Sequence, residues 1–386
     1  MDKYEYLWTM VRGNNMPGDL LKDDRAYSYE ELMGMNEKML VEKTGITLAQ
    51  ARYLVKAKME IDIDREYELF LKSGVNVVTV MDDGYPDKLK YIDNRPFALF
   101  YYGSLPKDDM PSVAIIGARN CSEYGRYMAQ SLGHELGCEK INIISGMAYG
   151  IDGIAGEAAL NGWDASGGKD FGKGSFAVLG CGVDVCYPRA NRKLYERLKN
   201  DGGIISEYPV GASAKPENFP MRNRIISGLA DIIIVVEARL KSGTFITVDY
   251  ALMQGREIMV VPGRATDPLS VGCNALMFQG ASPVQSKEDV TRLLGTILPH
   301  SYMQKNGTSD FKTKQLSEYI PKEKLKILLE REENMVYSVL DFYSLSPEDI
   351  ADALNMDIFK IMNILISLEM KGVVREIGKN LYVKCQ

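Results

Sequence analysis

The feature that most constrains the fold is a regular alternation of short apolar runs and helix-like segments between residues 112 and 297. Continuous apolar strands that alternate with helices are typical of a parallel sheet covered on both faces. We therefore expect an α/β domain with a doubly wound parallel sheet over residues 112–297. The predicted strands are Val113–Ile116, Ile141–Ile144, Phe176–Leu179, Gly203–Ser206, Ile232–Val236 and Glu257–Val261.

The first 104 residues have a different pattern. Tyr29–Met39 and Leu48–Ile61 carry apolar residues three and four positions apart, which predicts two helices. A turn at residues 44–47 separates them, and Thr47 is a suitable N-cap for the second helix. We expect an N-terminal helical domain over residues 1–104, with short strands at Val75–Val80 and Ala98–Tyr102.

The C-terminal part begins after a polar linker, residues 298–321. Residues 322–386 predict three helices followed by a hairpin, the order found in a winged helix-turn-helix domain. A helix that reads duplex DNA is normally basic, whereas the third helix here has only Lys360 and Lys371 against Asp357 and Glu369. This favours an interaction module. The expected elements are helices near Lys322–Leu340, Pro347–Leu354 and Asp357–Lys371, and strands at Val373–Ile377 and Leu381–Lys384.

Small residues and cations gather at the predicted carboxyl ends of the central strands. Ligands of such sheets bind in the crevice outside these ends. Arg119 follows the first strand, Lys241 follows the fifth, and Arg222 and Arg224 lie on the preceding helix. Cations beside free N–H groups at helix starts are typical of a phosphate site. We therefore expect an anion to bind at this edge.

Several common chemistries do not fit the sequence. The run GARNCSEYG lacks the GxGxxG fingerprint of a dinucleotide cofactor, and no Walker A motif is present. The chain has only two histidines, and its six cysteines lack zinc-like spacing, so we expect no catalytic residue, no metal and no cofactor. The absence of a long apolar run or a secretory signal predicts a cytoplasmic protein without a membrane partner. The formal net charge of −6 argues against a protein that binds nucleic acid through its overall charge. Nucleic acid could bind only at a local cationic groove.

The motifs together make the resemblance specific. The chain resembles the DNA-processing protein A family (DprA, also called Smf). The resemblance extends through residues 112–285 nearly without a break, and it includes the DGYP turn at residues 83–86. The matching runs are VAIIGAR (113–119), SGMAYGID (145–152), AVLGCGVDVCYP (177–188), SEYP (206–209), FPMRNRIISGL (219–229), VVEARLKSGT (235–244) and NALMFQGA (274–281).

The resemblance implies a Rossmann-like sheet between an N-terminal helical (SAM/HhH-like) domain and a C-terminal winged helix. It also implies a homodimer, formed through the Rossmann-like domain, that protects incoming single-stranded DNA in natural transformation and loads the recombinase RecA. A single strand offers phosphates and base faces, in agreement with the cationic edge. The residues expected to contact it are Gly117, Arg119, Ser145, Gly146, Tyr149, Asp152, Arg222, Asn223, Arg224, Lys241, Ser242, Gly243 and Thr244.

Three positions depart from the family pattern: Ala118 where a serine is common, Tyr149 where a basic residue is common, and Gly156 where a histidine is common. The first two put the phosphate contacts in doubt. An alternative function is a nucleotide-cleaving phosphoribohydrolase of a related fold. Those enzymes have a catalytic glutamate after a PGGxGT loop, and no glutamate follows Thr244 here, although Glu207 and Glu237 lie near strand ends.

Overall fold

The computed structural model describes residues 2–12, 27–167, 174–298, 331–340, 344–378 and 380–384. Contacts divide the chain into two compact units. The first comprises residues 1–121 and 128–305, and the second comprises residues 122–127 and 306–386. Nearly all of the predicted linker, and residues 322–330 of the first predicted C-terminal helix, lie outside the described residues. No helix in the described ranges combines the length and apolar character needed to cross a bilayer.

The first unit is built on one large sheet, in which the described residues form nine strands. The strand order is β1-β2-β6-β5-β4-β3-β7-β8-β9. All neighbours from β6 to β9 are parallel, and β1 and β2 are antiparallel additions at one edge. The strands are β1 (Asn76–Thr79), β2 (Ala98–Gly103), β3 (Ser112–Ile116), β4 (Asn142–Ser145), β5 (Ser175–Leu179), β6 (Gly203–Ser206), β7 (Ile232–Val235), β8 (Glu257–Val260) and β9 (Ser282–Pro283).

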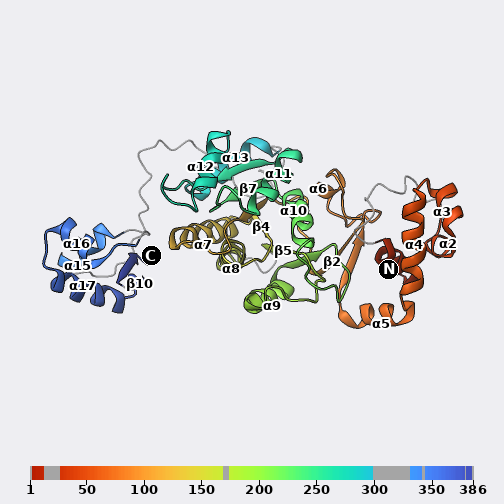
Figure 1. Cartoon of the computed structure of the whole chain (residues 1–386), viewed down its shortest axis with the longest axis horizontal. Coiled ribbons are helices and arrows are strands. Elements are labelled where there is room, and N and C mark those ends of the chain that lie inside the picture. The colour runs from red at the N-terminus through yellow and green to blue at the C-terminus, as the bar shows by residue number, and fades with distance from the viewer. Residues whose placement is uncertain are drawn as a thin grey trace. The chain divides into compact units, whose positions relative to one another are not determined.

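Helices cover both faces of this sheet, as the continuous apolar strands predict. Figure 1 shows α7, α8 and α9 on one side and α10 and α11 on the other. Every residue of β3, β4, β5, β6 and β7 is buried. The doubly wound α/β prediction is therefore confirmed. The helices of this part are α7 (Glu123–Cys138), α8 (Ile151–Ala165), α9 (Arg192–Asp201), α10 (Asn218–Leu229), α11 (Thr244–Met253), α12 (Val271–Phe278) and α13 (Lys287–Ile297).

The strand order creates a crevice at the centre of the sheet. From β3 the chain moves outward strand by strand to β6, and it then returns through α10 to β7 on the other side of β3. The loops after β3 and β7 consequently diverge to opposite faces. Such a switch point is where ligands of doubly wound sheets bind.

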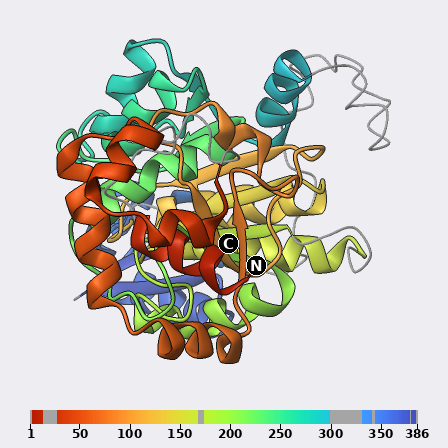
Figure 2. The ribbon, with the colours of Figure 1, turned by 90° about the vertical axis from the view of Figure 1, so that its right-hand side faces the viewer.

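The N-terminal helices gather at one end of the first unit (Figures 1 and 2). Thr47 caps α4 through a capping box with Gln50, as expected. The single helix expected over Tyr29–Met39 is wrong, because α2 ends at Gly34 and Asn36 starts a new helix by accepting a hydrogen bond from the Met39 N–H at 2.9 Å. The helices are α1 (Lys3–Arg12), α2 (Tyr29–Gly34), α3 (Glu37–Thr44), α4 (Leu48–Glu60) and α5 (Ile63–Ser73).

The two short strands expected in residues 1–104 belong to the main sheet. β2 pairs with β6 in antiparallel register, with Phe100 opposite Ser206. The short helix α6 (Asp87–Lys90) packs on α10, and Lys88 forms an ion pair with Asp231 at 2.7 Å. Residues 1–104 and the central domain therefore share one compact unit, because the edge of the sheet finds its hydrogen-bond partners in the N-terminal part.

The second unit has three helices and a two-stranded antiparallel sheet, in the predicted order. They pack around a core that includes Ile350, Ile361, Leu365 and Val383. The elements are α15 (Arg331–Val339), α16 (Pro347–Leu354), α17 (Ile358–Met370), β10 (Val374–Gly378) and β11 (Leu381–Lys384).

Candidate nucleic-acid interface

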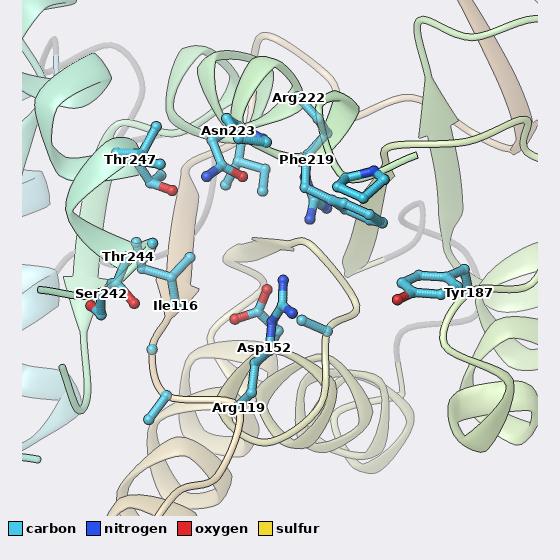
Figure 3. A pocket seen from close by; sticks show the side chains of 18 residues that line it. Ile116, Arg119, Asp152, Tyr187, Phe219, Arg222, Asn223, Ser242, Thr244 and Thr247 are labelled. Carbon is cyan, nitrogen blue, oxygen red and sulfur yellow. The ribbon is translucent and has the colours of Figure 1, made fainter. Parts of the chain in front are cut away.

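A cavity of about 610 Å³ lies at the switch point, outside the carboxyl ends of β3 and β7. Figure 3 shows side chains from several loops and helices surrounding it, with Arg119 and Asp152 on one side and α10 on the other. The lining residues are Ile116, Gly117, Ala118, Arg119, Ala148, Asp152, Tyr187, Pro216, Phe219, Pro220, Arg222, Asn223, Ile226, Ser242, Gly243, Thr244, Ile246 and Thr247.

The loop after β3 brings Arg119 to the cavity. The Ile151 N–H donates to the carbonyl of Ala118 at 3.2 Å, which joins this loop to the start of α8. The approach is possible because Gly150 has a φ of +71° and no side chain to collide with that carbonyl. Arg119 is exposed, and it has no ion-pair partner among the described residues. Its guanidinium is therefore available to an anion.

The start of α11 forms another side of the cavity. Gly243 precedes the helix and provides no side-chain cap; instead, the Phe245 and Ile246 N–H groups donate to the carbonyls of Ser242 and Gly243, each at 3.2 Å. The Ser242 hydroxyl is buried and has no hydrogen-bond partner among the described residues. A hydroxyl at the positive end of a helix dipole suits a phosphate oxygen.

Two buried side chains of opposite charge, Asp152 and Arg222, line the base of the cavity. Asp152 accepts a hydrogen bond from the Gly146 N–H at 2.9 Å, and the Arg222 guanidinium donates to the Gly146 carbonyl at 3.0 Å and to the Val178 carbonyl. Burial raises the pKa of Asp152, against the opposing effect of the Arg222 charge. Burial also lowers the pKa of Arg222 to about 10. Arg222 is only 5% exposed and is therefore mainly a brace between α10 and the ends of β4 and β5.

Arg224 does not reach the cavity. It is 3% exposed, it forms an ion pair with Glu207, and it donates to the carbonyls of Asn94 and Met221, each at 2.8 Å. These contacts use the guanidinium to join α10 to the loop between α6 and β2. The expectation that Arg224 holds a phosphate does not fit this placement.

Two aromatic side chains line the side of the cavity opposite α11. The rings of Tyr187 and Phe219 lie 5.2 Å apart between centroids, at an interplanar angle of 35°. Phe219 packs on Gly180, where a Cβ would lie 3.0 Å from the ring, and it also faces the cavity. Sequence reasoning missed Tyr187, because it follows β5 by several residues instead of ending a strand.

Eight of the thirteen expected contact residues line the cavity: Gly117, Arg119, Asp152, Arg222, Asn223, Ser242, Gly243 and Thr244. The remaining five are Ser145, Gly146, Tyr149, Arg224 and Lys241. The Ser145 hydroxyl is buried and donates to the backbone carbonyl of Asp152 at 3.2 Å. Tyr149 and Lys241 are exposed on loops near the cavity's lining residues in sequence.

The carboxylates of the enzyme alternative are not placed for chemistry in this cavity. Glu207 is paired with Arg224, and Glu237 is 1% exposed. Asp152 is the one carboxylate among the lining residues, and its interactions with Gly146 and Arg222 hold it in place.

Comparison with known proteins agrees with this architecture. The family model described as "DNA recombination-mediator protein A" matches residues 76–295. The DNA processing protein DprA of Streptococcus pneumoniae is 41% identical over 212 residues, which cover 55% of this chain and 72% of that protein. The Smf protein of Escherichia coli is 34% identical over 257 residues, which cover 66% of each chain.

Solved structures give the same assignment. The crystal structure of DNA processing protein A from S. pneumoniae superimposes with a TM-score of 0.61 at 32% identity, covering 76% of this chain and 98% of that one. A structure of the Helicobacter pylori protein, described for its single-stranded DNA binding mode, gives a TM-score of 0.50 at 27% identity, covering 57% of this chain and 96% of that one. The chain thus belongs to the DNA recombination-mediator protein A family.

Proposed function

We propose that this protein binds single-stranded DNA at the switch-point cavity, protects incoming strands in natural transformation and loads RecA onto them. The observation that carries the proposal is the combination, around one cavity, of the exposed Arg119, the Ser242 hydroxyl at the N-terminal end of α11 and the aromatic pair Tyr187 and Phe219. A single strand presents phosphates and unstacked bases together, and it needs both kinds of partner.

The cavity's charge distribution supports a polymer backbone as the ligand. Arg119 is exposed on the loop after β3, whereas Arg222 lines the cavity but is only 5% exposed. One exposed cation beside the positive end of a helix fits a phosphodiester, because each phosphodiester carries a single negative charge. Lys241, three residues before the start of α11, would meet the next phosphate of a strand that continues past the cavity.

The direct test is a titration of the full chain with fluorescent oligo(dT), with a duplex of equal length as the competitor. The affinity for the single strand should fall with salt, with a log–log slope near −0.7 for each phosphate neutralised. A slope near zero, or equal affinity for the duplex, would contradict the proposal. Assays on nucleoside monophosphates should release no free base; release that depends on Asp152 would favour the phosphoribohydrolase alternative.

RecA loading needs its own measurement. DNA-dependent ATP hydrolysis by RecA should start sooner on strands coated with single-strand-binding protein when this protein is added. Unchanged lag times, with oligo(dT) binding intact, would remove the loading role and leave the binding role standing.

The homodimer part of the proposal has a candidate surface on the first unit. Leu252 and Met253 at the end of α11 and Phe278 at the end of α12 are exposed apolar side chains, and both helices pack on β8. Phe278 is 95% exposed. Phe278→Ser should convert a dimer to a monomer in analytical ultracentrifugation, and an unchanged sedimentation coefficient would exclude this surface.

A further inference from the structure

An apolar stripe runs along the outer face of α17 in the second unit. Phe359, Met362, Ile366 and Met370 are spaced three, four and four residues apart, so they lie on one side of the helix. Their exposed fractions are 74%, 37%, 49% and 86%. We call these four residues the α17 stripe.

Folding of the unit does not account for the α17 stripe. The opposite side of the helix already supplies the core contacts, through Ile361, Ile364, Leu365 and Leu368. A helix that is apolar on both sides is normally covered on both sides. Single exposed apolar residues are common, but four in helical register form a contiguous patch of the kind that marks an interaction site.

The cations of α17 are already neutralised within the unit. Lys360 forms an ion pair with Glu332, and Lys371 forms one with the buried Glu333 at 2.6 Å. Binding to the major groove requires cations that neutralise phosphates. The outer face of α17 therefore has the wrong chemistry for reading duplex DNA.

The charges around the α17 stripe indicate that the partner surface carries positive charge. Glu369 and Glu376 are exposed near its C-terminal end, and neither has a cation partner among the described residues. The second unit, residues 122–127 and 306–386, contains twelve Lys and Arg against fourteen Asp and Glu, a formal charge of 12 − 14 = −2. Two such units would repel each other, which disfavours a second copy as the occupant.

We propose that the α17 stripe docks an amphipathic helix of a partner protein, with an apolar face against the stripe and lysine or arginine residues along its flanks. The spacing of the stripe suits the packing of a helix along it. Flanking cations would meet Glu369 and Glu376. The proposal is independent of the switch-point cavity, because it rests on contacts inside the second unit.

The experiment uses the full chain and two synthetic helical peptides of about 18 residues, or five turns. Both peptides carry leucine at helical spacing; one has lysine on its flanks and the other has glutamate. Fluorescence anisotropy should detect binding of the lysine peptide, with the glutamate peptide at least about tenfold weaker. Equal binding of the two peptides, or no binding of the lysine peptide, would overturn the proposal.

Two variants locate the site. Phe359→Ser combined with Ile366→Ser should weaken binding of the lysine peptide by about tenfold or more, because two of the four apolar anchors are lost. Both side chains are exposed, so the fold should tolerate the change. The matched control is Met59→Ser, which removes an apolar side chain that is 82% exposed on α4. Equal loss in the control, or none in the stripe variant, would contradict the assignment.

Further measurements distinguish a cationic helix from other possible occupants of the α17 stripe. Glu369→Lys should weaken binding of the lysine peptide and strengthen binding of the glutamate peptide, because it reverses a charge beside the stripe. Self-association of the full chain that the Phe359→Ser/Ile366→Ser variant abolishes would show that a second copy occupies the stripe. Loss of duplex binding in that variant would show a nucleic-acid surface, and either result would overturn the proposal.

Discussion

The arginines of α10 and the cations of the neighbouring loops have the same charge but opposite surroundings. Arg222 and Arg224 are 5% and 3% exposed, and their guanidinium groups are engaged by backbone carbonyls and carboxylates. Arg119 and Lys241 are exposed and have no ion-pair partner among the described residues. The difference teaches that cations in one motif cluster can divide into structural braces and available ligand contacts.

The largest expected effect comes from removing the deeper brace. Arg222→Ala should lower the free energy of unfolding by about 3–5 kcal/mol, because it leaves Asp152 buried without its cation and two carbonyls without a donor. Urea unfolding followed by circular dichroism measures the change. Arg222→Lys should recover only part of it. A wild-type unfolding midpoint for Arg222→Ala would show that this arginine is not a brace.

A smaller effect is expected from crowding the same brace. A Cβ at Gly146 would collide with the Arg222 guanidinium, so Gly146→Ala should cost about 1–3 kcal/mol of stability. Gly243→Ala is the matched control. It has an ordinary φ and nothing within 4 Å of the added Cβ, so its unfolding free energy should change by less than about 1 kcal/mol. Similar losses of unfolding free energy in Gly146→Ala and Gly243→Ala would show that contact with the Arg222 guanidinium is not the cause.

Substitution of an exposed cation should lower the affinity for DNA and leave the stability of the fold unchanged. Arg119→Ala should weaken oligo(dT) binding by about tenfold, the loss of one charged hydrogen bond, and should reduce the salt slope by about 0.7. Stability should stay within about 0.5 kcal/mol of wild type. Unfolding and binding measured on one preparation give both numbers. Wild-type affinity would place the strand elsewhere.

Lys241→Ala should have the smallest effect. Lys241 does not line the cavity, so we expect a loss of affinity of about threefold or less, together with unchanged stability. A loss larger than that of Arg119→Ala would mean that the strand runs mainly along the turn before α11. Lys241, and not Arg119, would then be the main exposed cation that contacts the strand.

Much of the fold could be predicted because its signals are local. The strands β3 to β8 are continuous apolar runs, and Thr47 and Gln50 form a capping box within four residues. The division of the predicted helix Tyr29–Met39 was missed because one capping side chain, Asn36, outweighed the periodic pattern. The joining of β1 and β2 to the main sheet could not be predicted, since it depends on pairing with β6, about a hundred residues away.

The candidate site, like the fold, was predicted where its signals are local and missed where they depend on tertiary packing. The sequence located the residues after β3 and β7, because carboxyl ends of parallel strands share one edge. It did not identify Tyr187, which reaches the cavity through the path of a loop, and it could not distinguish Arg222 from Arg119.

The sequence by itself determined the fold class, the family and the edge of the sheet at which we propose that a ligand binds, since those depend on periodicity and on short motifs. Only the tertiary structure decided which cations are available. A guanidinium pairs with whatever the fold brings beside it, and for Arg224 that includes Asn94, Glu207 and Met221, from three separate segments of the chain. Burial and pairing are properties of the packed molecule, and no motif contains them.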